Sequence, residues 1–285
     1  MTRPPVVGLL HPGAMGASVG AAAVKAGHRV LWASAGRSGA SARRAADAGL
    51  EDAGTLEALA RAAAVVVSVC PPQAAVDVAR NVMAAGFRGL FVDANAVSPA
   101  TARAIAAAVA DGGASFVDGG IIGPPAWREG TTRLYLAGER AEEVAGLFAG
   151  SLLDARVIPG GAGMASALKM AYAAYTKGTS ALVANILALA EREGVAAALR
   201  DEWTTSQPAL ARTAQAHVVG SAPKAWRWVA EMEEIAATFE AAGLPGDFHR
   251  GAARVFGRLT AFKDEEAPAV EAIIEALLAA RGARA

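Results

Sequence analysis

The sequence predicts an α/β chain in two parts, a parallel sheet with helices on both faces followed by a unit built only of helices. Short β-branched runs alternate with alanine-rich helical stretches over the first half. The pattern changes near residue 160, and no strand pattern follows up to Ala285. A length of 285 residues suits two units of about 150 residues each. We therefore predict domains over 1–160 and 161–285.

The predicted elements follow from these patterns in chain order. Helices are expected to begin near Met15, Ser41, Gln73 and Ser98, and Gly27 is expected to end the first of them. The second unit opens with a long helix predicted over 164–192, and a later helix should run to about residue 242. The strands are predicted from short apolar runs at 6–10, 29–33, 64–69, 90–93, 115–118 and 133–137, with another apolar run at 155–159.

Composition excludes several classes of protein. Hydrophobic residues make up 54% of the chain and 27 basic residues balance 27 acidic ones, which argues against disorder and against a nucleic-acid partner. The single cysteine, Cys70, excludes an internal disulfide, and His217 and His249 have no partner at metal-ligand spacing, so we predict no metal. Pro12 and several glycines interrupt the uncharged N-terminal stretch, which argues against a signal peptide or membrane span. We expect a cytoplasmic protein.

A glycine-rich turn follows the first predicted strand and reads His-Pro-Gly-Ala-Met-Gly. A strand, a glycine turn and a helix N-terminus in this order are typical of a dinucleotide site, because backbone N–H groups and the helix dipole face the pyrophosphate. The usual fingerprint has glycine where this chain has a histidine, and a turn without a ligand is the alternative. We predict that the cofactor contacts His11, Pro12, Gly13, Ala14 and Met15.

The end of the second predicted strand indicates which nicotinamide cofactor is bound. An NAD site usually has Asp or Glu there, but this chain has no acid and instead offers Ser34, Arg37 and Ser38. Two hydroxyls and a guanidinium suit a 2′-phosphate, so we predict NADP(H), with NAD(H) less favoured. The alternative is that these residues form an exposed helix start.

Four segments resemble the superfamily of β-hydroxyacid dehydrogenases and 6-phosphogluconate dehydrogenases, which includes imine reductases. Segment 8–16 ends in Gly-x-Met-Gly, 92–99 is similar to the Asp-x-Ser-Thr segment beside the nicotinamide, 116–123 to the substrate loop, and 161–169 to the glycine run before the catalytic lysine. The resemblance implies a doubly wound Rossmann sheet, a helical domain that forms a homodimer, and a small-molecule substrate. Cofactor contacts are also expected at Cys70, Pro71 and Asn95.

The resemblance implies that Lys169 is the catalytic acid and base, and Tyr172 is predicted from its place on the helix as a second catalytic group. Tyr172 and Thr176 lie on the same helix face as Lys169, although helix packing is an alternative role for Tyr172. The predicted substrate contacts are Ile122, Gly123, Tyr172, Thr176, Glu231 and Glu234. For the two glutamates, a solvated acidic face is the alternative. Ile122 stands where the family has a carboxylate-binding serine, and Tyr172 and Ala173 stand where it has asparagines, so the pattern fits a separate branch.

These features lead to one main hypothesis and two alternatives. The main hypothesis is an NADP-dependent oxidoreductase, similar to 3-hydroxyacid dehydrogenases, that interconverts a small carbonyl and an alcohol. An imine reductase is the first alternative, which the missing carboxylate contacts and Tyr172 favour and the retained Lys169 disfavours. A non-catalytic NADP-binding sensor is an alternative of another class.

Overall fold

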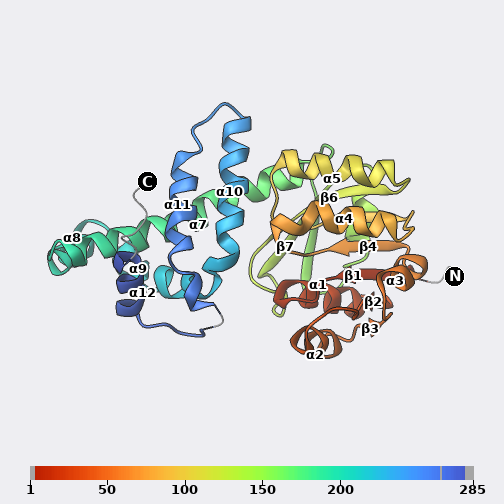
Figure 1. Cartoon of the computed structure of the whole chain (residues 1–285), viewed down its shortest axis with the longest axis horizontal. Coiled ribbons are helices and arrows are strands. Elements are labelled where there is room, and N and C mark those ends of the chain that lie inside the picture. Colours follow the sequence, from red (N-terminus) through yellow and green to blue (C-terminus); the bar gives the residue numbers. More distant parts are fainter. Residues whose placement is uncertain (1–3, 264, 280–285) are drawn as a thin grey trace. The chain divides into compact units, whose positions relative to one another are not determined.

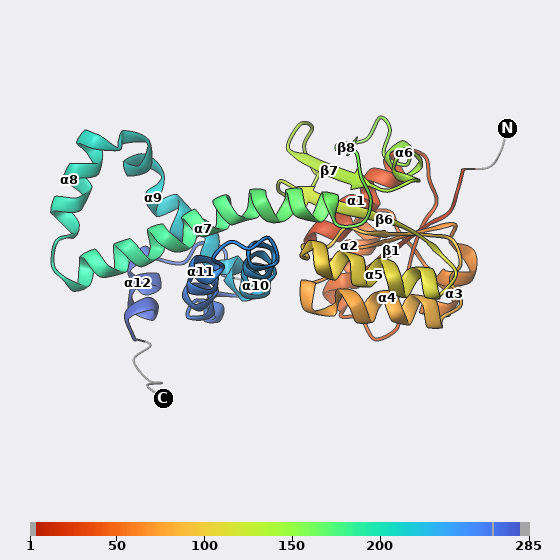
Figure 2. The ribbon, with the colours of Figure 1, turned by 90° about the horizontal axis from the view of Figure 1, so that it is seen from above.

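The computed structural model describes residues 4–263 and 265–279. The chain divides into two compact units, Met1–Met170 and Ala171–Ala285. Helix α7, Met164–Arg192, begins in the first unit and continues into the second as one long helix (Figure 2). The predicted division at residue 160 lies just before this helix, whereas the compact units divide within it, because its first turns pack on the sheet of the first unit.

The first unit contains an eight-stranded sheet with the order β3-β2-β1-β4-β5-β6-β7-β8. Neighbouring strands from β3 to β6 are parallel, β7 is antiparallel to β6, and β8 is parallel to β7. The predicted α/β class with a doubly wound, mostly parallel sheet is therefore confirmed. The strands are β1 Val7–Leu10, β2 Val30–Trp32, β3 Glu51–Asp52, β4 Val65–Ser68, β5 Leu90–Asp93, β6 Ser115–Ile122, β7 Thr132–Ala137 and β8 Leu153–Val157.

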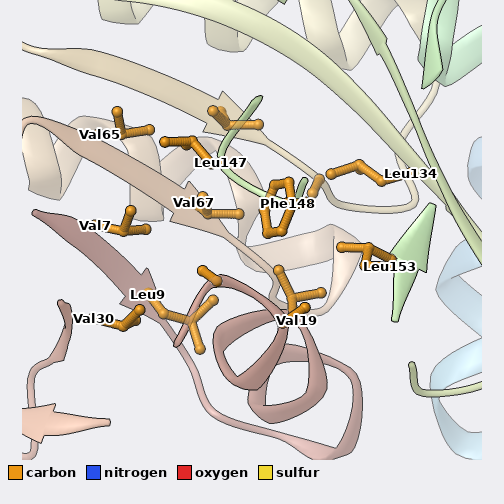
Figure 3. Packing of buried hydrophobic residues seen from close by; sticks show 14 of the residues in the cluster. Val7, Leu9, Val19, Val30, Val65, Val67, Leu134, Leu147, Phe148 and Leu153 are labelled. Atoms are coloured by element: carbon orange, nitrogen blue, oxygen red, sulfur yellow. The ribbon is translucent and has the colours of Figure 1, made fainter. Parts of the chain in front are cut away.

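Helices cover both faces of this sheet. Successive side chains of a strand point to opposite faces, and both sets are buried. On one face, Val65 and Val67 pack with Val19 of α1 and with Phe148 (Figure 3). On the other face, Val66 packs with side chains from α3, α4 and α5. Figure 1 shows α4 and α5 on one side of the sheet and α1 and α2 on the other. The helices are α1 Ala14–Lys25, α2 Gly39–Asp47, α3 Leu56–Ala62, α4 Ala75–Ala84, α5 Pro99–Asp111 and α6 Ala141–Gly146.

Three elements were not predicted, and one strand is longer than predicted. Strand β3 is a pair of exposed acidic residues, and α3 and α6 are too short to show a helical period. The strand predicted over 115–118 is too short, because β6 continues to Ile122 and pairs there with β7. A Cβ at Gly120 would lie 2.7 Å from the carbonyl oxygen of Ala165, so the close approach of α7 requires glycine at this position in the strand.

All the secondary-structure elements in the described part of the second unit are helices, as predicted. Arg250 donates to both Glu233 and Glu240 and so ties α11 to α10, and the rings of Trp228 and Phe256 meet edge to face at 5.2 Å. None of the described helices combines the length and apolar character that a membrane crossing requires. Its helices after α7 are α8 Ala196–Ser206, α9 Pro208–Ser221, α10 Ala225–Ala241, α11 Asp247–Gly257 and α12 Val270–Ala279.

Within the second unit, α7 exposes a row of large apolar side chains. Tyr175, Leu182 and Leu189 are 75%, 46% and 60% exposed, and each lies seven residues after the one before it. This spacing keeps the three side chains on one face of the helix. The homodimer expected from the sequence stays a prediction.

The beginning of α7 is fixed by the carboxylate of Asp118, the fourth residue of β6. Its Oδ2 accepts hydrogen bonds from the backbone N–H groups of Gly163 at 2.9 Å and Ser166 at 3.0 Å. Its Oδ1 accepts a bond from the Ser166 hydroxyl at 2.7 Å. Asp118 and Ser166 are completely buried. A carboxylate from a neighbouring strand thus satisfies N–H groups that the first turn of a helix leaves unpaired.

Asp118→Ala should lower the free energy of unfolding by about 3 kcal/mol, because it leaves several buried donors without an acceptor. Urea unfolding followed by circular dichroism would measure the change. Asp111→Ala is the matched control, since Asp111 is exposed at the end of α5 and its removal should change stability by less than about 0.5 kcal/mol. Equal stability of the two variants would contradict the role of Asp118.

Candidate functional site

The strand order places a topological switch point between β1 and β4. From β1 the chain moves outward through β2 and β3, then returns to β4 on the other side of β1. Ligands of doubly wound sheets bind beyond the carboxyl ends of the strands at such a point. The segments that follow these strand ends, 11–13, 33–38, 69–71 and 94–98, contain most of the predicted cofactor residues.

The turn between β1 and α1 has the tight geometry of a nucleotide loop. The N–H of Gly13 donates to the carbonyl oxygen of His11 at 2.7 Å. A Cβ at Gly16 would lie 2.4 Å from that same oxygen, so only glycine fits there. Helix α1 then begins at Ala14 with no side-chain cap and no acidic residue in its first turn. Its positive dipole end is therefore suited to an anion.

Basic side chains from the segment after β2 surround this loop. Arg44 of α2 donates from Nε to the carbonyl oxygen of Pro12 at 3.0 Å and from Nη2 to Ser41. Arg37 is exposed, and its charge acts on both His11 and Cys70, which places it between the loops that follow β1 and β4. Arg37 is thus an exposed cation at this edge that could meet a phosphate.

The two predicted serines have partners within the protein. Ser38 caps α2 by accepting a hydrogen bond from the N–H of Ser41. Ser34 bonds to the carboxylate of Asp52 at the end of β3, and this bond is the main reason why the pKa of Asp52 lies below its usual value. The cofactor roles of Ser34 and Ser38 stay predictions.

Asn95 joins the ends of β4 and β5. Its Oδ1 accepts from the N–H of Cys70 at 2.5 Å, and its Nδ2 donates to the Ser68 hydroxyl at 3.2 Å and to Asp93. Burial, together with the nearby Asp93 carboxyl, raises the pKa of the Cys70 thiol to about 12, so the sulfur is protonated at neutral pH. Asn95 therefore shapes the loop of Cys70 and Pro71, where cofactor contacts were predicted.

Two buried carboxyl groups stand side by side at the ends of β5 and β6. Asp93 and Asp118 are register partners, and both are fully buried. Burial and the neighbouring Asp118 raise the pKa of Asp93 to about 7, and burial also raises the pKa of Asp118. The Oδ2 atom of Asp93 has no hydrogen-bond partner among the described residues. The sequence signal for both residues was an aspartate within an apolar run, but it predicted neither role.

Lys169 lies at the same edge of the sheet, in the first unit. It is half-buried on α7, one turn beyond the Asp118 cap, and its Cβ lies 3.1 Å from the position that a Cβ on Gly120 would occupy. Gly120 follows Asp118 by two residues on β6, so the helix and the strand together fix where the lysine begins. The structure thus brings Lys169 and the nucleotide loop to one edge of one compact unit.

The segment after β6 is attached to the first turns of α1. Ala126 donates its N–H to the buried hydroxyl of Ser18 at 3.0 Å, and Thr132 donates to the carbonyl oxygen of Pro124 at 2.6 Å. Gly123 is exposed in this segment, whereas Ile122 is only 4% exposed. Their substrate contacts stay predictions. The anchoring role of Ser18 was not predicted, since a single serine in a helix gives no sequence signal.

The remaining predicted residues belong to the second unit. Tyr172 is 45% exposed, and Thr176 donates to its carbonyl oxygen at 3.4 Å. Glu231 forms an ion pair with Lys177, whose ammonium lies 5.5 Å from the centre of the Trp228 ring. Glu231 therefore has its charge balanced inside the unit, which the sequence did not predict because the two residues lie far apart in the chain.

Glu234 follows Glu231 by one turn of α10 and is half-buried. The roles predicted for it and for Tyr172, Thr176 and Glu231 stay predictions. The described part of the chain contains no group of three His, Cys, Asp or Glu side chains that could hold a metal ion.

Comparison with known proteins agrees with this geometry. Residues 6–147 match the NAD binding domain of 6-phosphogluconate dehydrogenase, and residues 190–259 match a domain of unknown function, DUF1932. The chain belongs to the 6-phosphogluconate dehydrogenase-like superfamily. The resemblance predicted from the sequence is thus confirmed, and the first unit is an NAD(P)-binding domain. No curated protein matches the sequence.

Solved structures of this superfamily share the fold over nearly the whole chain. A conserved hypothetical protein from Sinorhizobium meliloti is 27% identical, with 97% of this chain and 96% of that chain covered and a TM-score of 0.69. The 3-hydroxyisobutyrate dehydrogenase of Mycobacterium tuberculosis is 22% identical, with 96% and 99% covered and a TM-score of 0.67. An imine reductase from Streptomyces aurantiacus is 21% identical, with 95% and 98% covered and a TM-score of 0.54. This chain therefore shares its fold with a 3-hydroxyisobutyrate dehydrogenase and an imine reductase.

The raised pKa of Asp93 predicts a specific dependence of stability on pH. The folded state holds this proton up to about pH 7, whereas the unfolded chain releases it near pH 4. The contribution of Asp93 to stability is therefore complete at low pH and is lost as pH rises to 7, at about 1.4 kcal/mol per pH unit. Asp93→Asn, which mimics the neutral acid, should gain stability relative to the natural chain over this range.

Urea unfolding of both proteins at several pH values between 4 and 8 would measure that difference. The exposed Asp111→Asn is the matched control and should show no such trend above pH 5. A constant difference between Asp93→Asn and the natural chain from pH 4 to 7 would show that Asp93 is ionised in the fold.

Proposed function

We propose that this protein is an NADP(H)-dependent oxidoreductase that interconverts a small carbonyl compound and an alcohol, with Lys169 as the acid and base. The observation that supports it is the placement of Lys169. Asp118 caps the helix of the lysine, and Gly120 lies against its Cβ, at the sheet edge that carries the nucleotide loop. One rigid unit thus fixes both the proton-transferring group and the cofactor loop.

The residues at this edge fit a nicotinamide dinucleotide. The N-terminus of α1 would face the pyrophosphate without a competing acidic residue, and the absence of a Cβ at Gly16 lets the helix begin close to the carbonyl oxygen of His11. Arg37 is the cation for a 2′-phosphate. When bound, the nicotinamide would supply or accept the hydride.

The part of Lys169 in this chemistry is proton transfer. Reduction of a carbonyl leaves negative charge on oxygen, which the ammonium group stabilises and then protonates. In the reverse direction the neutral amine removes the alcohol proton. The buried Asp93 and Asp118 do not serve this role, because Asp118 is committed to α7 and Asp93 is fully buried beneath Asn95.

Lys169→Ala should lower kcat for the substrate by at least about a hundredfold, since general acid catalysis contributes 10² to 10⁴ in rate. The affinity for NADPH should change less than about twofold. A panel of 2- and 3-oxo acids, aldehydes and cyclic imines, followed by NADPH absorbance, would first identify a substrate. Lys263→Ala, on the second unit, is the matched control. An unchanged kcat in Lys169→Ala would exclude the lysine as acid and base.

Arg37→Ala should weaken NADP⁺ binding by about ten- to a hundredfold, because one charge-assisted phosphate contact is worth about 1.5–3 kcal/mol. NAD⁺ binding should change little. Fluorescence titration with both dinucleotides would measure the effect, with the exposed Arg80→Ala on α4 as control. Tighter binding of NAD⁺ than NADP⁺ by the natural chain would contradict the cofactor preference.

Imine reduction is the second candidate, and the exposed Tyr172 favours it. The phenol lies one turn beyond Lys169 on α7 and is 45% exposed, so a second proton donor is present on that helix. The cyclic imines in the panel distinguish the two reactions. Turnover of any substrate would exclude the third hypothesis, a non-catalytic NADP sensor.

A further inference from the structure

His11 has an unusual backbone conformation for a residue with a side chain. Its φ is +63°, and it is the only non-glycine residue with positive φ in the part of the chain that the structure describes. It occupies the place of the first glycine of the nucleotide fingerprint. Glycine would adopt this conformation at no cost, whereas a histidine pays about 1 kcal/mol or more for it. The imidazole is therefore held there by its surroundings.

The charged side chains that act on His11 or lie beside its turn are basic. Arg37 from the segment after β2 acts on the imidazole electrostatically, and Arg44 of α2 is bonded to the neighbouring Pro12 carbonyl. Arg37 also acts on Cys70 in the loop after β4, whose thiol is neutral and which the Asp93 carboxyl also influences. The Nδ1 atom of His11 is buried and has no hydrogen-bond partner among the described residues. Burial and Arg37 lower the pKa of His11 to about 4, so the free protein keeps it neutral.

We propose that His11 takes up a proton from solvent when a dinucleotide binds, and that the resulting imidazolium pairs with the pyrophosphate. This inference rests on the proposed cofactor site at the α1 N-terminus. The pyrophosphate carries two negative charges and would lie on the turn that contains His11. Both ring nitrogens of a protonated histidine donate hydrogen bonds, so Nδ1 would gain a partner that it lacks within the protein.

Proton uptake makes cofactor affinity depend on pH. A nearby opposite charge raises a histidine pKa by about 1–3 units, so the bound protein should hold the proton at pH values where the free protein does not. Between the pKa of the free protein, about 4, and that of the complex, the dissociation constant should rise up to about tenfold per pH unit. One proton should enter for each dinucleotide bound in this range.

The experiment is calorimetric titration with NADP⁺ from pH 5 to 8, in pairs of buffers with different heats of ionisation, which reports proton uptake directly. The natural chain is compared with His11→Asn and His11→Gly, neither of which titrates. Asparagine also tolerates positive φ, so His11→Asn preserves the turn. The 2′-phosphate, with a pKa of about 6, titrates alike in all three proteins and cancels in the comparison.

The expected result is uptake that exceeds that of both variants by as much as one proton, together with affinity that weakens faster with rising pH. Equal uptake and equal pH dependence in the natural chain and His11→Asn would overturn the inference and leave the cofactor site intact. A uniform gain in affinity at every pH in both variants would also overturn it, by showing that the imidazole obstructs the site. Failure of all three folded proteins to bind any dinucleotide would overturn the proposed function as well.

Discussion

The contact on which the candidate site most depends is the carboxylate of Asp118 at the start of α7. The parallel pairing of β6 with β5 ends at Asp118. The carboxylate oxygens of Asp118 accept hydrogen bonds from the residues that begin the 29-residue helix α7. Because the acceptors are buried and the donors belong to the helix backbone, the bonds set both the register and the direction of the first turn. The position of Lys169 on α7 follows from this contact.

At this edge of the sheet, acidic and basic side chains lie in different places. Asp93 and Asp118 are fully buried at the ends of β5 and β6, and burial raises the pKa of both. The dipole end of α1, Arg37 and Arg44 lie toward the loops after β1 and β2. A polyanionic ligand is therefore favoured at the loops, and the raised pKa of Asp93 reduces the negative charge that would oppose such a ligand.

The sequence predicted the features that depend on local pattern. The β-branched runs predicted most of the strands, and the glycine turn predicted the nucleotide loop. The helical pattern over 164–192 predicted α7 with the observed bounds. What it did not predict depends on residues distant in the chain. No periodic sequence pattern predicts that Glu231 pairs with Lys177 or that Ser18 bonds to Ala126. The predicted strand 115–118 ended before the Gly119–Gly120 pair, because a glycine that permits a close helix contact within a strand has no distinct sequence pattern.

Charge also distinguishes the two candidate reactions. Reduction of an imine proceeds through a cationic C=N group, and an ammonium at Lys169 would repel it in the low dielectric of a closed site. A carbonyl instead gathers negative charge on oxygen as the hydride arrives, which the same ammonium stabilises. Glu231, which was predicted as a substrate contact, is paired with Lys177. This contrast in charge is why we propose carbonyl chemistry, with imine reduction as the second candidate, for a site that contains Lys169.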